Sequence, residues 1–175
     1  MRPAALVIVA ALALGGCSGP GMREGAVING TSYSMQEVQE AVAQVDSVAV
    51  NPVGVPEIIY EAAVVDLIAD AFHGSPYSVS DAQLASTMRE AGLEGEPNEL
   101  TLDSARFRHY ASILQAPGIQ EDPEMGPVLA QLNAVTQEDI TSLEVEVNPR
   151  YGTWQPEQGG VVAEVPAWIT PSGTN

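Results

Sequence analysis

Apolar residues concentrate in one segment of the chain, Pro56 to Gly74, which is bounded like a single helix. Pro56 suits the first helical turn, where its missing N–H costs nothing, and Gly74 suits the left-handed position after a last turn. Because apolar residues cover most of its circumference, the segment predicts the central helix of a helical domain, with other helices crossing it.

The polar positions of this segment predict two solvated flanks. At about 100° per residue, Glu57 and Glu61 share one side, and Asp66, Asp70 and His73 share roughly the opposite side. Each half of the helix is therefore expected to meet water on a different flank.

The trio of Asp66, Asp70 and His73 also has a spacing that suits a divalent metal. A histidine in the last turn is, however, what the helix dipole favours, and acids one turn apart are typical of a solvated flank. Only one other histidine, His109, is available to complete a site. The sequence therefore favours a solvated flank, and predicts no metal and no cofactor.

Two short signals precede the central helix. Residues 26–28 predict a short strand, and Asn29-Gly30 is a strong signal for a two-residue hairpin. Ser34 and Glu37 match a capping box, which opens an amphipathic helix to about Ser47.

Further helices are predicted after the central one. A capping box at Ser80 opens a helix that Gly92 stops, and Thr101 is a plausible cap for the next. A shorter helix is expected at residues 123–135, followed by one turn capped by Thr136.

The hydrophobic period then changes from that of a helix to that of a strand. Residues 143–147 alternate apolar and acidic side chains, which is typical of a half-buried strand, and residues 26–28 are the obvious partner. The chain beyond Trp154 is rich in glycine and proline and is expected to be a loose tail. We therefore expect a single, mainly α domain whose small sheet pairs the N-terminal hairpin with a late strand.

The first seventeen residues predict export and a lipid anchor. The apolar run from Ala4 to Leu14 is too short to span a bilayer, which takes about 20 apolar residues. Leu14, Gly15, Gly16 and Cys17 then resemble the lipobox of bacterial lipoproteins, which implies that Cys17 is diacylated and becomes the mature N-terminus. The alternative is an ordinary cleaved signal with an incidental cysteine, but Cys17 is the only cysteine of the chain.

These signals divide the chain into four parts. They are a lipoprotein signal peptide at residues 1–16, the lipidated cysteine and a tether at 17–25, the helical domain at 26–154 and the tail at 155–175. Because two acyl chains hold a protein firmly, the expected location is the extracytoplasmic face of the cell membrane.

The chain is strongly acidic. It holds 6 basic residues, all of them arginine, against 23 acidic ones, and loss of Arg2 with the signal peptide leaves a net charge of −18. This charge repels nucleic acid and anionic headgroups, so we expect no nucleic-acid partner and a domain that projects from the membrane. Arg150 is expected to pair with a nearby carboxylate such as Glu144 or Glu146 and not to contact a ligand.

Taken together, these features resemble the SurA N-terminal-domain family of envelope chaperones, in particular a small lipoprotein branch of actinobacteria. The likeness rests on AVING at residues 26–30, on NPRYGTW at residues 148–154 and on the lipobox, and covers residues 26–154. It implies a holdase-like domain that shields unfolded exported polypeptides. Many relatives carry an inserted parvulin prolyl isomerase domain, for which the roughly forty residues between Thr101 and Leu143 are too few.

The sequence carries no motif for catalysis. It has no G-x-S-x-G, H-E-x-x-H or Walker loop, and the anchor uses Cys17. A carboxylate pair for glycoside hydrolysis stays open among the acids, but no pair is singled out. We therefore expect a non-catalytic protein.

Two functions remain open, a holdase for exported polypeptides and a scaffold lipoprotein that binds one defined cell-envelope partner. Met35, Met88 and Met125 lie on apolar stripes, where methionine fills core gaps more often than it lines a binding groove. Residues 161–168 carry isolated apolar side chains, which suggests a plug that folds back into a groove between helices.

Overall fold

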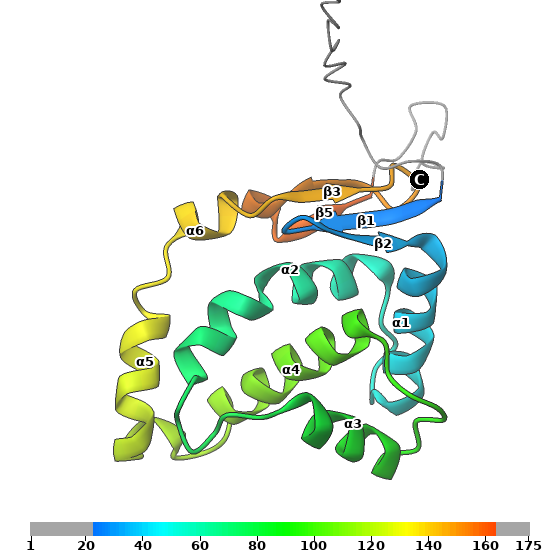
Figure 1. Cartoon of the computed structure of the whole chain (residues 1–175). Coiled ribbons are helices and arrows are strands. Elements are labelled where there is room, and N and C mark those ends of the chain that lie inside the picture. The colour runs from blue at the N-terminus through cyan, green and yellow to red at the C-terminus, as the bar shows by residue number, and fades with distance from the viewer. Residues whose placement is uncertain (1–22, 164–175) are drawn as a thin grey trace, which may run out of the picture.

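The structure is a computed structural model that describes residues 23–163, so Cys17, the lipobox and the chain beyond Ala163 lie outside it. Within these residues, the chain forms six α-helices and a layer of short strands at one end of the domain (Figure 1). The expectation of a mainly α domain with a small sheet is confirmed. None of the described helices has both the length and the apolarity to cross a membrane.

The sheet brings both ends of the described chain together. β1 (Glu24–Ile28) and β2 (Thr31–Ser34) form a hairpin, and β3 (Val145–Val147) lies antiparallel to β1 with Val147 opposite Ala26. The predicted pairing is confirmed. β1 begins two residues earlier than expected because Glu24 still pairs with Ser34 across an irregularity at Gly25, which shortens the tether.

The segment after Trp154 is not a loose tail where it is described. β4 (Thr153–Gln155) and β5 (Gly160–Val162) form a second antiparallel pair around the 3-10 turn η3 (Pro156–Gln158). The expectation of a tail from residue 155 is wrong because Val161 packs on the core and contributes to the sheet layer. Val161 therefore does not lie between helices, and residues 164–168 of the proposed plug lie outside the described residues.

The first helix begins at the predicted cap, whereas the second begins at Val55, one residue before the predicted first helical residue Pro56. In α1 (Met35–Val48), Ser34 Oγ accepts the Glu37 N–H, and the Glu37 carboxylate accepts the Ser34 N–H at 2.7 Å. α2 (Val55–Phe72) is the central helix, and Gly74 after it has a φ of 75°.

The next two helices confirm one cap and correct the other. α3 (Asp81–Glu90) starts with the expected capping box at Ser80. Thr101 is not the cap of α4 (Glu99–Leu114), because Asn98 Oδ1 accepts the Thr101 N–H at 2.9 Å and so caps the helix three residues earlier. Thr101 is fully buried.

The helix expected at residues 123–135 is divided in two. After η1 (Ile119–Glu121), η2 (Pro123–Met125) is a 3-10 turn and α5 covers Gly126–Leu132. The division follows from Pro127, which lacks the N–H that would bond to the Pro123 carbonyl in a continuous α-helix. α6 (Gln137–Thr141) then begins at Thr136, as predicted.

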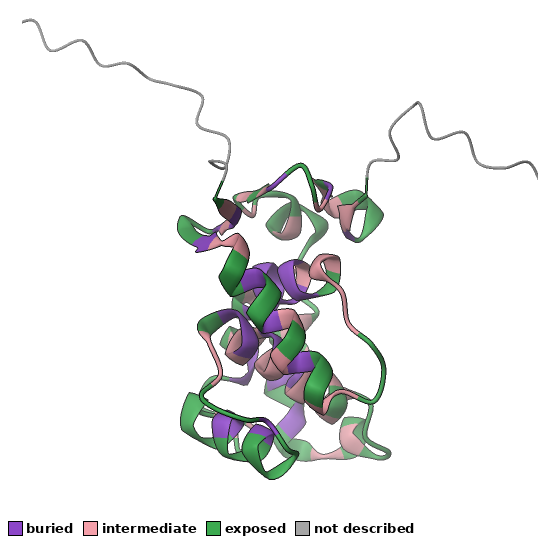
Figure 2. Ribbon diagram, turned by 90° about the vertical axis from the view of Figure 1, so that its right-hand side faces the viewer, coloured by how far each residue is buried: buried purple, intermediate pink, exposed green. Residues whose placement is uncertain are grey.

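Two buried clusters hold the helices together, and Figure 2 shows buried positions along the middle of the domain. One cluster joins the sheet, α1, α2 and the start of α4 around Ile58, Ile59 and Leu100. The other joins the ends of α2 and α4 to α5, with Phe72 stacked on Tyr110 at 4.1 Å between ring centroids. The first described element, β1, begins at Glu24. A chain that starts at residue 18 therefore keeps every described helix and strand.

Candidate functional site

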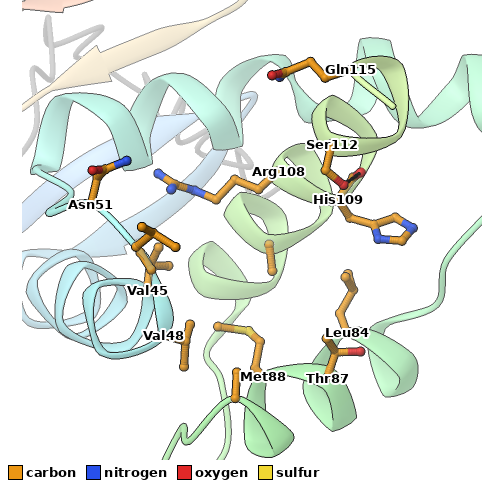
Figure 3. A pocket seen from close by; sticks show the side chains of 14 residues that line it. Val45, Val48, Asn51, Leu84, Thr87, Met88, Arg108, His109, Ser112 and Gln115 are labelled. Carbon is orange, nitrogen blue, oxygen red and sulfur yellow. Dashed lines mark hydrogen bonds between the residues drawn. The ribbon is translucent and has the colours of Figure 1, made fainter. Parts of the chain in front are cut away.

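A groove of about 710 Å³ opens between the end of α1, α3 and the second half of α4 (Figure 3). Of its fourteen lining residues, eight are apolar and none is acidic. Figure 1 places α3 at the end of the domain opposite the sheet, whereas the described chain starts at β1 and ends just after β5. The groove is therefore distant from both ends of the described chain.

The end of α1 and the loop after it form one apolar wall. Val45 and Val48 lie three residues apart and thus on one helix face. The loop is held because the Val53 N–H donates to Asp46 Oδ1 at 3.2 Å. This arrangement leaves Val50 beside the groove with 98% of its surface exposed. An exposed valine of this kind offers apolar contact without any structural role of its own.

Helix α3 forms the second apolar wall. Leu84 and Met88 lie one turn apart, and Figure 3 shows Met88 and Val48 projecting into the space between α1 and α3. Met88 is 6% exposed, so it belongs to the core and also lines the groove. Met125 is fully buried, and Met35 lies near Asn148 in the sheet layer. Of the three methionines considered in the sequence, only Met88 therefore contributes to the groove.

Helix α4 forms the polar wall of the groove. Its Arg108 is held in place by an ion pair with Glu61 on α2. Arg108 Nη2 lies 2.8 Å from Glu61 Oε1, and Arg108 Nε donates to Glu61 Oε2 at 3.0 Å. Ser104, which is fully buried, donates its Oγ–H to the same carboxylate. The positive charge of Arg108 is therefore neutralised inside the protein, and the groove receives a polar but nearly uncharged wall.

The position of Glu61 corrects the expected solvated flank. Glu61 is 7% exposed because α4 packs over this side of α2, whereas Glu57 is exposed as predicted. The opposite flank agrees with the prediction, since Asp66, Asp70 and His73 are all exposed. Residues 23–163 contain no group of three or more acidic, histidine or cysteine side chains placed to hold a metal.

The only titratable groups that line the groove are Arg108 and His109. Burial lowers the pKa of His109, and this effect outweighs its interaction with the Tyr77 backbone, which raises the pKa. His109 is therefore neutral at pH 7, so the groove interior as a whole carries almost no net charge.

A second polar cluster lies on α4, away from this wall. Arg106 pairs with Asp81 at the start of α3 and with Asp103 at 2.8 Å. Burial raises the pKa of Asp103 to about 6, although Arg106 pulls this pKa down. The cluster fixes α3 on α4 and so fixes the groove wall that α3 provides.

At the sheet end, two aromatic residues of the NPRYGTW stretch cover the core. Tyr151 and Trp154 both pack on the first cluster, and the Trp154 ring lies 6.3 Å from that of Tyr60 on α2. The prediction of an ion pair for Arg150 is wrong, because within the described residues its guanidinium forms no ion pair with Glu144 or Glu146. The backbone N–H of Arg150 donates to Asn148 Oδ1 at 3.1 Å.

Comparisons with protein-family models, with curated proteins and with solved structures give no match for this chain. The likeness to the SurA N-terminal-domain family therefore stays a prediction from the sequence.

Proposed function

We propose that this chain is a membrane-anchored lipoprotein whose domain acts as a non-catalytic holdase, and that it binds apolar segments of unfolded exported polypeptides in the groove between α1, α3 and α4. The observation that supports this function most is the lining of the groove. The chain has 23 acidic residues, but none of the fourteen residues that line the groove is acidic. An open, apolar and carboxylate-free surface is what an unfolded apolar segment requires.

The position of the groove suits a protein anchored at Cys17. Only residues 18–23 separate Cys17 from β1 in the sequence. The sheet layer would then lie next to the membrane, and the groove would open at the far end of the domain, towards arriving polypeptides.

The test uses residues 18–175 at near-stoichiometric ratio with two unrelated unfolded substrates, and follows their aggregation by light scattering. In the test variant, Val48→Asn and Val50→Asn remove two apolar side chains from the groove without changing the net charge. In the control variant, Ser47→Asn and Ser86→Asn alter exposed positions of α1 and α3 that do not line it.

We expect the unmodified domain and the control to suppress aggregation of both substrates, and the test variant to lose most of this effect while its circular dichroism is unchanged. Equal suppression by both variants would refute the groove as the binding surface. Failure to suppress either substrate would refute the holdase and favour the scaffold that binds one envelope partner, to be sought by pull-down from envelope extract.

A further inference from the structure

The charges around the groove differ from those inside it. Asp46 on α1 lies three residues before the lining residue Ala49, and Glu90 on α3 lies three residues after the lining residue Thr87. Residues three apart are neighbours on a helix surface, so both carboxylates border the groove. Both are exposed.

The arginines near the groove do not offset these carboxylates. Each of the three arginines on α3 and α4 is already paired with acidic side chains: Arg89 with Glu96, Arg106 with Asp81 and Asp103, and Arg108 with Glu61. The other two arginines of the described residues, Arg23 and Arg150, border β1 and β3 in the sheet layer at the opposite end. The surface around the groove is therefore net negative.

From this charge pattern we infer that the groove selects apolar segments flanked by lysine or arginine. The inference rests on the proposed function, since it names the class of segment that the same groove binds. The apolar centre of such a segment contacts the uncharged walls, while its flanking cations lie beside Asp46 and Glu90. A segment flanked by glutamate would instead meet like charge at both borders and across the surrounding surface.

The range of these interactions predicts a dependence on salt. The flanking cations stay in solvent, where charges are screened over about 10 Å at 0.1 M salt and about 3 Å at 1 M. The preference for basic flanks must therefore weaken as salt rises. The contact of the apolar centre with the groove does not depend on charge and must persist.

The experiment uses residues 18–175 and three short fluorescent peptides with blocked termini, each with the same Leu-Val-Phe-Ala-Leu centre. One peptide has a pair of lysines on each side, the second has serines and the third has glutamates. Kd is measured by fluorescence anisotropy at about 50 mM and at about 500 mM salt. The higher concentration shortens the screening length, so that Asp46 and Glu90 attract the flanking cations much less.

We expect the lysine-flanked peptide to bind about tenfold more tightly than the serine-flanked one at low salt, and the glutamate-flanked peptide to bind more weakly than both. At high salt the three Kd values converge. In Glu90→Gln the lysine-to-serine ratio falls about twofold to threefold, whereas Glu146→Gln, which makes the same charge change on β3, leaves the ratio nearly unchanged.

The outcomes separate this inference from the proposed function. Equal binding of the lysine-flanked and serine-flanked peptides at low salt would overturn the inference and leave the holdase intact. Failure of all three peptides to bind would overturn both. An equal loss of preference in Glu90→Gln and Glu146→Gln would show that overall charge is responsible, and would overturn the role of the groove border.

Discussion

The carboxylate of Glu61 on α2 and the guanidinium of Arg108 on α4 form two contacts, at 2.8 Å from Oε1 to Nη2 and at 3.0 Å from Oε2 to Nε. The two side chains differ in burial, since that of Glu61 is 10% exposed and that of Arg108 is 36% exposed. One ion pair therefore connects the core to the groove, and the shape of the groove depends on it.

This difference in burial predicts unequal costs for removing each partner. Arg108→Met leaves a buried carboxylate unpaired and should lower the free energy of unfolding by about 3 kcal/mol, the low end of the usual cost for a broken buried pair. Glu61→Met leaves an arginine that still reaches water and should cost about half as much. The double variant should return to within about 1 kcal/mol of the original protein, because apolar pairs often replace buried ion pairs well. Urea denaturation measures all three, and a smaller cost for Arg108→Met than for Glu61→Met would contradict this explanation.

The stability of the domain should increase on mild acidification. Burial raises the pKa of Asp103 to about 6, so the folded protein binds this proton more tightly than the unfolded chain does. Stability from this group is fully present below the unfolded pKa near 3.8 and is lost as pH rises through about 6.

Other carboxylates oppose this trend at lower pH. Hydrogen bonds with Ser34 lower the pKa of Glu37, and hydrogen bonds with Thr136 lower that of Asp139, so both helix caps stabilise the fold at neutral pH and weaken once these groups are protonated. We expect Tm to rise from pH 7 to about pH 5 and to fall below about pH 4. Asp103→Asn should flatten the rise, and a Tm that falls steadily from pH 7 to pH 5 would be inconsistent with the raised pKa.

The second strand pair requires a glycine at position 152. Gly152 has a φ of 127°, and a Cβ there would lie 2.3 Å from the Val162 carbonyl oxygen. Gly159 also has a positive φ, of 90°, but a Cβ there meets nothing within 4 Å. Gly159→Ala should therefore cost about 1 kcal/mol from backbone strain alone, and Gly152→Ala clearly more. Hydrogen exchange should show faster opening of β4 and β5 only in Gly152→Ala, and equal rates in both variants would refute the steric argument.

Membrane attachment is predicted to depend on Cys17. In a bacterial host that modifies lipoproteins, the full chain should partition with the membrane fraction, and Cys17→Ser should remain unacylated, as measured by the mass of the mature N-terminus. Ser18→Ala is the matched control and should still carry the lipid. An unmodified Cys17 in the exported protein would favour the ordinary cleaved signal instead.

Local signals in the sequence were sufficient for most of the fold. The capping residues Ser34, Ser80 and Thr136 all precede helices. Each side chain accepts a backbone N–H from the first turn of the helix that follows, so this signal lies within four consecutive residues of the sequence. The pairing of β3 with β1 followed from an alternating strand that needed a partner.

The features that were missed depend on contacts between distant segments. The burial of Glu61 requires α4 to cross that side of α2, and one helix alone cannot indicate which of its acids is covered. β5 was missed because Gly159 and Gly160 favour a loop locally, whereas Gly160 is needed where the chain passes Tyr60. The groove likewise needs the relative positions of three helices, and the only local signal was the apolar Val50 beside Asn51-Pro52.

Occupation of the groove can be measured directly from Val50. Residues 18–175 contain no cysteine, so Val50→Cys carries a single environment-sensitive fluorophore at an exposed position, and Ser32→Cys on β2 carries the same label at the sheet end. Titration with an unfolded exported polypeptide should shift the emission at position 50 to shorter wavelength and protect it from a soluble quencher, with no change at position 32. The same response at both positions, or none at position 50, would contradict the proposal that the groove binds unfolded polypeptides.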